Sequence, residues 1–193
     1  MTLFDLLFIV LFLTAIGVLA AAMVAALRGR PDRALRRLRR LGIGAGSYMV
    51  VVTLVSLVSP RRVAARGEDQ CSDDWCIAVT DIARAGTGAL DTFHVAFRLS
   101  SRARRVTQRE RFVVAYMRDV TGRRYDASPQ DGQPPFDTPL GAGESITTSR
   151  TFAVPAHAAG LGVVVAREGG FGFPGCCIIG EGLFHKPPIV YVE

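Results

Sequence analysis

The chain has 193 residues, enough for one ordinary domain and a short additional segment, and its formal net charge is +6. Residues 1–66 contain 10 arginines and 2 acidic residues (10 − 2 = +8), whereas residues 67–193 contain 13 Lys and Arg against 15 Asp and Glu (13 − 15 = −2). A nucleic-acid-binding domain carries its basic residues on its folded part, so this distribution argues against nucleic acid as a partner.

Two apolar segments open the chain. The first, residues 3–27, has a single charged residue, Asp5, near its outer edge. As a helix it would be about 37 Å long, enough to cross the hydrocarbon core of a bilayer. The second, residues 41–58, would be about 27 Å long, at the short end of the range. Uncharged runs of this length are rare in the cores of soluble proteins, so we expect two transmembrane helices rather than two buried ones.

The first segment could also be read as a signal peptide, since Ala20, Ala21 and Ala22 are small residues of the cleavage type. It lacks a positively charged start, however, and it is too long for the apolar region of a signal peptide. A basic cluster follows it, which is the arrangement of a stop-transfer segment. We therefore expect it to be retained as an anchor.

A basic loop, residues 28–40, separates the two segments and contains seven arginines and one acidic residue. Only Arg61, Arg62 and Arg66 follow the second segment, so the positive-inside rule places the loop in the cytoplasm. Both termini are then extracytoplasmic, as in a multi-pass protein of a bacterial cytoplasmic membrane. Pro31 and Asp32 predict a turn, and residues 34–40 a short basic helix on the lipid headgroups. The arginines that determine this topology are Arg28, Arg30, Arg33, Arg36, Arg37, Arg39 and Arg40.

Gly42 and Gly46 form a G-x-x-x-G pair in the second segment, and the first segment has small residues as well. Such faces allow close packing, either within the hairpin or between two copies of the chain, so a homo-oligomer through these glycines is one expectation. Neither segment has a charge near its middle, which argues against a transporter. We interpret the hairpin, residues 1–59, as an anchor with membrane lipids as its partner.

The rest of the chain predicts a linker over residues 60–70 and an all-β antiparallel sandwich over residues 71–193. Short runs of alternating, β-branched or aromatic residues recur there between turn residues, and no segment keeps a helical period. The glycines between Gly160 and Gly182 match no phosphate-binding pattern. We predict strands over residues 76–83, 91–99, 111–119, 145–154, 161–167 and 189–192, with a short strand at Tyr125.

Three short motifs stand in this part of the chain: Gly122-Arg-Arg-Tyr125, Leu140-Gly-Ala-Gly-Glu-Ser145 and Thr151-Phe-Ala-Val-Pro155. They resemble the G-x-x-Y, L-x-P-G-E-S and F-x-V-P motifs of a bacterial immunoglobulin-like family of unknown function, some of whose members are titled as telomeric-repeat-binding factors. Ala142 replaces the proline of the second motif. The resemblance covers roughly residues 75–193 and implies an immunoglobulin-like, membrane-anchored domain outside the cytoplasm. It implies no catalytic residues.

All four cysteines, Cys71, Cys76, Cys176 and Cys177, lie in the predicted extracytoplasmic part, where thiols are usually oxidised. Three pairings are open. Cys71 with Cys76 is slightly favoured, which leaves a vicinal pair or two free thiols, whereas either crossed pairing would tie the first strand to the loop before the last. The alternative is a metal or redox site that includes His185. The C-x4-C spacing and the adjacent cysteines are both unusual for zinc, and a C-x-x-C motif is missing.

The other candidate groups predict no chemistry. The acidic residues 68, 69, 73 and 74 lack calcium-loop spacing, and no serine and acid can be assigned to His94, His157 or His185. The arginines between residues 102 and 111 are interpreted as a solvated hairpin end, with binding of an anionic lipid or polymer as the alternative. The sequence thus favours a non-enzymatic binding or structural module, without metal or cofactor, whose partner is a protein or an envelope polymer.

Overall fold

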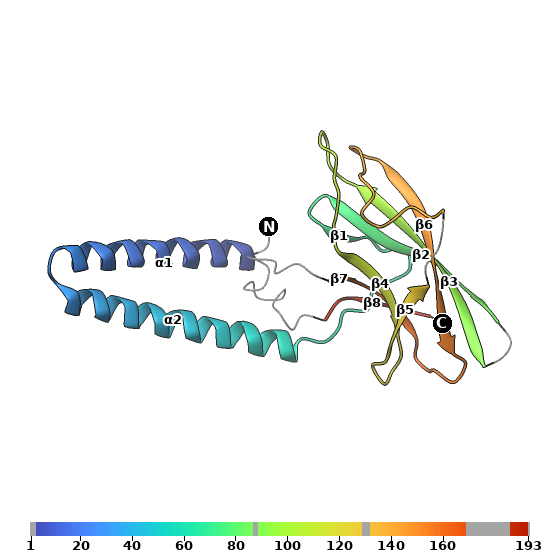
Figure 1. The fold of residues 1–193 in the computed structure, drawn as a ribbon, viewed down its shortest axis with the longest axis horizontal. Coiled ribbons are helices and arrows are strands. Elements are labelled where there is room, and N and C mark those ends of the chain that lie inside the picture. The colour runs from blue at the N-terminus through green and yellow to red at the C-terminus, as the bar shows by residue number, and fades with distance from the viewer. Residues whose placement is uncertain (1–2, 87–88, 129–131, 169–185, 193) are drawn as a thin grey trace. The chain divides into compact units, whose positions relative to one another are not determined.

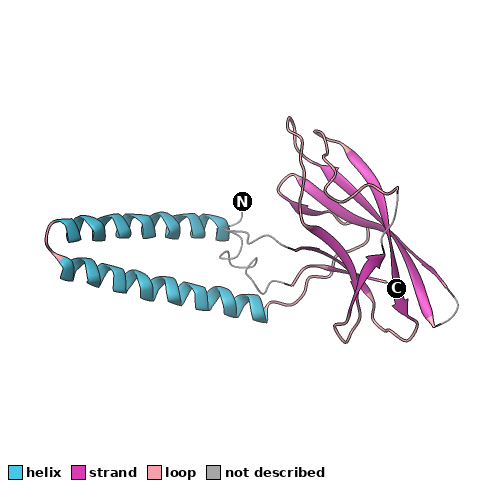
Figure 2. Cartoon of the chain, in the orientation of Figure 1, coloured by secondary structure: helices cyan, strands magenta, loops and turns pink. Residues whose placement is uncertain are grey.

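The computed structural model describes residues 3–86, 89–128, 132–168 and 186–192 (Figure 1). Its contacts divide the chain into two units. One contains the two helices and the other contains the strands (Figure 2).

The helical unit is a pair of helices, α1 (Leu3–Leu27) and α2 (Pro31–Val58), joined by a three-residue turn. Both are long and apolar enough to cross a membrane. The turn predicted at Pro31 is wrong, because Pro31 is the first residue of α2. Proline is favourable there, since the first helical N–H has no partner to lose. The basic residues 33–40 therefore belong to α2 itself, and the loop shrinks to residues 28–30.

Small side chains mediate the contact between the two helices near this turn. Ala22, Ala25 and Ala34 form a buried cluster, and Arg37 Nη1 donates a hydrogen bond to the carbonyl oxygen of Ala21 at 2.5 Å. Gly42 and Gly46 take no part, because a Cβ on either would meet no described atom within 4 Å. The expectation that these glycines pack the hairpin is wrong, and their use between two copies stays a prediction.

The C-terminal end of α2 is capped by polar groups. Ser59 donates two hydrogen bonds to the carbonyl of Val55, from its backbone N at 2.9 Å and from its Oγ at 2.7 Å. The ammonium group of Lys186, the chain's single lysine, donates to the carbonyls of Leu57 and Ser59, each at 3.3 Å. A cation is favourable at this end, where the carbonyls of the last turn lack helical partners.

The β unit is an antiparallel sandwich of eight strands in the order β1-β2-β3-β6-β5-β4-β7-β8. The sheet folds over at β5: its first residues pair with β4, and its last two, Ala127 and Ser128, pair with β6. The strands are β1 (Gln70–Ser72), β2 (Trp75–Ala85), β3 (Leu90–Ser101), β4 (Val113–Arg118), β5 (Arg124–Ser128), β6 (Ser145–Pro155), β7 (Gly162–Arg167) and β8 (Ile189–Tyr191).

Residues 62–69, here called the strap, join the two edges of this folded sheet. Val63 pairs with Ile189 of β8 in parallel, and the N–H of Ala64 donates to the Ile189 carbonyl at 2.9 Å. Further along, the N–H of Gly67 donates to the carbonyl of Val79 in β2 at 2.7 Å. Most of the expected linker over residues 60–70 is therefore part of the β unit.

The far end of the strap is fixed by Asp69. Its carboxylate accepts hydrogen bonds from Arg98 of β3 and from Arg102, each at 2.9 Å. The bond from Arg98 is the main reason that the pKa of Asp69 lies below its ordinary value. The acidic cluster predicted from the sequence is thus partly an ion-pair network that holds the strap.

The core lies between the two layers and follows the period of two expected of strands. Phe93, Val95, Phe97 and Leu99 of β3 are all buried, and Phe93 pairs in register with the buried Phe152 of β6. Phe136, from the connection before β6, packs its ring edge-on against Phe97 at 5.2 Å between centroids.

Arg150 is in phase with Phe152 on β6 and is half-buried. Its guanidinium lies 4.4 Å from the Phe136 ring and donates to Thr148 Oγ1 at 2.8 Å and to the Pro134 carbonyl at 3.0 Å. Burial lowers its pKa from the ordinary value. Arg150 therefore fastens the connection of residues 132–140 over the open edge of the core.

The three family-like motifs build turns and core. Gly122, at φ +89°, closes the β4–β5 turn, and the Tyr125 hydroxyl donates to Asp119 Oδ2 at 2.9 Å across it. Glu144 Oε2 accepts from the Gly141 N–H at 2.6 Å in the turn before β6. Phe152 and Val154 are fully buried. In the described structure these residues contribute to turns and to the core.

The basic run after β3 does not form a hairpin end, contrary to the prediction. β3 and β4 are not neighbours in the sheet, so residues 102–112 cross from one layer to the other. Arg109 of this connection pairs with Asp137 at 2.6 Å, and Arg102 pairs with Asp69. The run is therefore partly neutralised.

Candidate functional site

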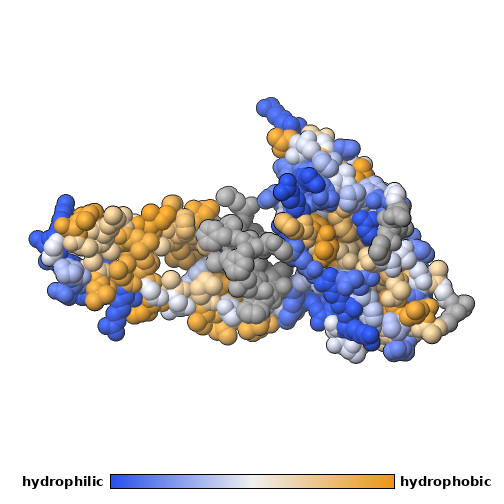
Figure 3. Space-filling model, viewed as in Figure 1, coloured by the Kyte–Doolittle hydropathy of each residue, from blue (hydrophilic) through white to orange (hydrophobic). Residues whose placement is uncertain are grey.

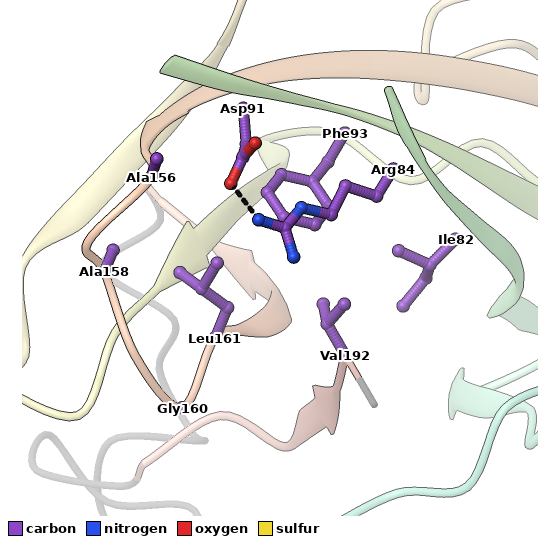
Figure 4. A pocket seen from close by; sticks show the side chains of 9 residues that line it. All are labelled: Ile82, Arg84, Asp91, Phe93, Ala156, Ala158, Gly160, Leu161 and Val192. Carbon is purple, nitrogen blue, oxygen red and sulfur yellow. Dashed lines mark hydrogen bonds and ion pairs between the residues drawn. The ribbon is translucent and has the colours of Figure 1, made fainter. Parts of the chain in front are cut away.

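A cavity of about 240 Å³ lies at the end of the β unit where the β2–β3 hairpin and the β6–β7 connection meet (Figure 4). Seven of its nine lining residues are apolar and two carry charge, and polar atoms make up the larger share of the exposed wall. Apolar walls with a few polar groups are typical of small ligand sites, although this cavity is below the usual size range. The lining residues are Ile82, Arg84, Asp91, Phe93, Ala156, Ala158, Gly160, Leu161 and Val192.

The charged pair of the cavity is asymmetric. Asp91 Oδ2 accepts a hydrogen bond from Arg84 Nη2 at 2.5 Å. The side chain of Asp91 is only 7% exposed, whereas that of Arg84 is 60% exposed. The Arg84 guanidinium also lies 5.9 Å from the centroid of the Phe93 ring. The carboxylate is therefore a fixed, buried charge, and the guanidinium is a mostly solvated one.

Strand alternation explains how these residues reach the cavity. Asp91 is in phase with the buried Phe93 and Val95 of β3, so its carboxylate points inward. On β2 the pairing shifts register between Val79 and Asp81. Such a bulge moves the residues that follow to a new phase. Arg84 consequently lies opposite Phe93 and reaches Asp91.

The outer edge of β2 beside the cavity is unpaired within the described part of the chain. β1 covers β2 only as far as Ile77, and the strap reaches Val79 through Gly67. Residues 80–85 pair only with β3. Because alternate residues of a strand direct their peptide groups to opposite sides, this segment presents free backbone donors and acceptors next to the cavity.

Of the residues predicted as disulfide partners, Cys71 and Cys76 are joined in a disulfide across the paired strands β1 and β2. This is the pairing that the sequence favoured. It also removes two thiolates from the metal alternative while the bond is intact. Cys176, Cys177 and His185 lie outside the described residues.

We expect the Cys71→Ser, Cys76→Ser double variant to lose about 2 kcal/mol of unfolding free energy, the value for closing so short a loop. The measurement is chemical denaturation of the full chain, followed through Trp75, the single tryptophan, which is 3% exposed. Reductant should shift the wild-type curve toward that of the variant and leave the variant unchanged. Equal curves for the two oxidised proteins would contradict the prediction.

Of the three histidines that the sequence predicted to be structural, His94 and His157 are among the described residues. His94 Nδ1 lies 3.1 Å from Thr151 Oγ1 on the exposed side of β3 and β6. Neither residue lines the cavity. Over the described ranges, no group of three or more His, Cys, Asp or Glu side chains is placed to hold a metal ion.

The sequence reasoning missed Arg84 and Asp91. One signal was available: Asp91 occupies the same alternating phase as Phe93, Val95, Phe97 and Leu99, where an apolar residue is expected. An acid in the apolar phase of a strand indicates a buried charge with a partner.

The described strands form an antiparallel β-sandwich, and two helices of membrane length precede them in the chain. No known family model matches the sequence, and no curated protein matches it. The immunoglobulin-like resemblance therefore stays a prediction.

Three solved bacterial proteins have some likeness to the chain. An uncharacterized beta-sandwich protein from Clostridium difficile 630 is 7% identical with a TM-score of 0.44, over 70% of this chain and 97% of that one. A secreted protein from Mycobacterium tuberculosis is 13% identical with a TM-score of 0.45, over 69% and 99%. The yjhA protein from Bacillus subtilis is 10% identical with a TM-score of 0.47, over 68% and 100%. At these values no functional argument follows, and the sandwich rests on its own strand pairing.

Proposed function

We propose that the chain is a non-enzymatic binding module of the bacterial cell envelope. In this proposal its two helices cross the cytoplasmic membrane as a hairpin and carry an extracytoplasmic, immunoglobulin-like domain. The partner is a protein or an envelope polymer. The observation that carries the proposal is the cavity with its buried Asp91, because a carboxylate that faces an open space among apolar side chains is an arrangement found in small ligand sites.

The distribution of arginines supports the orientation. Seven arginines lie in residues 28–40, which form the turn between the helices and the start of α2, and the positive-inside rule assigns this end of the hairpin to the cytoplasm. Both termini and the β unit then lie outside. The Cys71–Cys76 disulfide is consistent with that side, where disulfides persist.

Photocrosslinking in intact membranes tests the binding function. A photoreactive amino acid at Ala83, exposed on the free edge of β2, is expected to yield one discrete adduct with a partner. The matched control is Val106, 57% exposed in the connection between β3 and β4, which should not yield that adduct. Identical adducts from both positions, or lipid alone, would overturn the proposal.

The orientation has its own test. A reporter enzyme active only outside the cytoplasm should be active when fused after Val192 and inactive when inserted at Gly29. Replacing the seven arginines of residues 28–40 by glutamine should remove this difference, because the remaining positive charge lies on the other flank of the helices. Activity at Gly29 in the unaltered chain would show the opposite orientation.

A further inference from the structure

The two charges at the cavity differ in how freely they can move. Asp91 pairs with Val154 of β6, the pairing of β3 with β2 ends at the neighbouring Thr92, and the Asp91 side chain is nine-tenths buried. Arg84 lies near the end of β2, whose outer edge has no described partner there, and its side chain is mostly solvated. Figure 4 shows the guanidinium reaching across the cavity from the β2 side toward the carboxylate. The carboxylate is thus the more firmly held of the two charged groups.

The difference in burial between Asp91 and Arg84 determines whether a cationic or an anionic ligand can bind in the cavity. A buried carboxylate left without a cation loses its compensation and becomes costly, so a ligand that displaces Arg84 must bring a positive charge. An anionic ligand that bound Arg84 instead would have to approach Asp91, only 2.5 Å from that guanidinium. Exchange of one cation for another keeps the charge of the cavity constant.

The other residues that line the cavity are also suited to a positively charged group. The Phe93 ring faces the space that the Arg84 guanidinium occupies, and a cation over an aromatic face is stabilised by the ring quadrupole. Ile82, Leu161 and Val192 line the remaining wall. They would contact the aliphatic chain that carries the charged group.

We infer that this cavity binds an ammonium or guanidinium group on an aliphatic chain, with Arg84 as a tethered competitor for Asp91. The inference rests on the proposed binding function and names the chemistry of its ligand. Two sources carry such a group: a Lys or Arg side chain of an extended peptide, or a small free amine. The outer edge of residues 81–85, which has no partner strand in the described part of the chain, favours the peptide, because a strand added there would place alternate side chains toward the cavity.

Titration calorimetry on the full chain in detergent tests the inference with defined probes: butylammonium, butylguanidinium, butyrate and a capped Val-Lys-Val peptide. We expect the two cations to bind and butyrate not to bind. A peptide that binds at least about tenfold more tightly than butylammonium, roughly 1.4 kcal/mol, identifies edge pairing as part of recognition. Equal affinities identify the free amine as the source.

Two variants give opposite results if the competitor model holds. Arg84→Gln removes the competitor and should tighten cation binding roughly fivefold, the upper range for a partly exposed pair. Asp91→Asn should abolish it. Arg109→Gln, which breaks the exposed pair with Asp137 elsewhere in the domain, is the matched control and should leave affinity unchanged.

Weaker cation binding by Arg84→Gln, or binding of butyrate in place of the cations, would overturn the inference. So would failure of every probe to bind. If the crosslink from Ala83 still yields a discrete adduct in that case, the binding function stands and only the ligand chemistry fails. If the adduct is also missing, both proposals fail.

Discussion

Replacing Phe152 with alanine should lower the free energy of unfolding by about 3–5 kcal/mol. Its side chain is fully buried on the inward face of β6, where it pairs in register with Phe93 of β3. The alanine would leave a cavity between the two packed layers of the core. Because Phe152 is also the aromatic residue of the F-x-V-P motif, the same experiment tests our conclusion that this motif is structural.

The matched control is Phe112→Ala, since Phe112 is 59% exposed. Surface substitutions usually change stability by less than about 0.5 kcal/mol. Its positive φ of 66° is kept by either residue, so no difference in backbone strain enters the comparison. Both variants can be followed through Trp75 fluorescence during denaturation. Similar losses at the two positions would mean that the inward face of β6 is placed incorrectly.

Gly160→Ala should cost about 2–4 kcal/mol, from left-handed strain and from overpacking together. Gly160 has φ +59°, and a Cβ there would lie 2.1 Å from Val120 Cγ1. The contact matters because the N–H of Val120 donates to the Ala159 carbonyl at 3.1 Å, which joins the β4–β5 turn to the β6–β7 connection. The cavity wall would shift with it, since Gly160 and Leu161 both line the cavity.

Gly143→Ala separates these two contributions. Gly143 has φ +72°, but a Cβ there would meet no described atom within 4 Å, so only the backbone strain of about 1–2 kcal/mol applies. Adding Val120→Ala to Gly160→Ala removes the clashing methyl group and should return the loss to the Gly143→Ala level. A double variant as unstable as Gly160→Ala alone would show that steric overlap is not the cause.

Much of the fold follows from short-range pattern. The alternation over residues 91–99 predicted β3 with a boundary error of one or two residues, because Phe93, Val95, Phe97 and Leu99 all face the core. The strand near Tyr125 was also predicted, from its turn residues. Such strands can be predicted from the sequence because buried and exposed positions alternate along them.

The strap and β1 could not be predicted from such an alternation of apolar and polar residues. They are short and polar, and their partners are distant in sequence: Val63 pairs with Ile189, and Asp69 pairs with Arg98. Only the folded sheet brings those partners close. The start of α2 was misread for a different reason, since Pro31 fits both a turn and a first helical position, and the helical continuity of the following arginines decided between them.

The candidate site could be recognised only from the tertiary fold. Its lining comes from β2, β3, the β6–β7 connection and the residue after β8, which no local spacing relates. What the sequence does contain is a charge in an apolar phase, at Asp91 on β3 and at Arg150 on β6. Both are held by side-chain or backbone partners in the structure, Asp91 at the cavity and Arg150 at the connection that covers Phe136.

The strap has a mechanical consequence. Any pull on the β unit through the chain that precedes it enters at residue 62, and it loads the two hydrogen bonds to Ile189 first. Once these bonds, the Gly67–Val79 hydrogen bond and the Asp69 ion pairs give way, the nine residues 62–70 can extend to a total length of about 30 Å. Extension then stops at Cys71, whose disulfide passes the load to Cys76 within the paired strand β2. Under tension the strap would therefore detach, and take the buried Ala64 out of the core, before the disulfide-linked strands β1 and β2 bear the load.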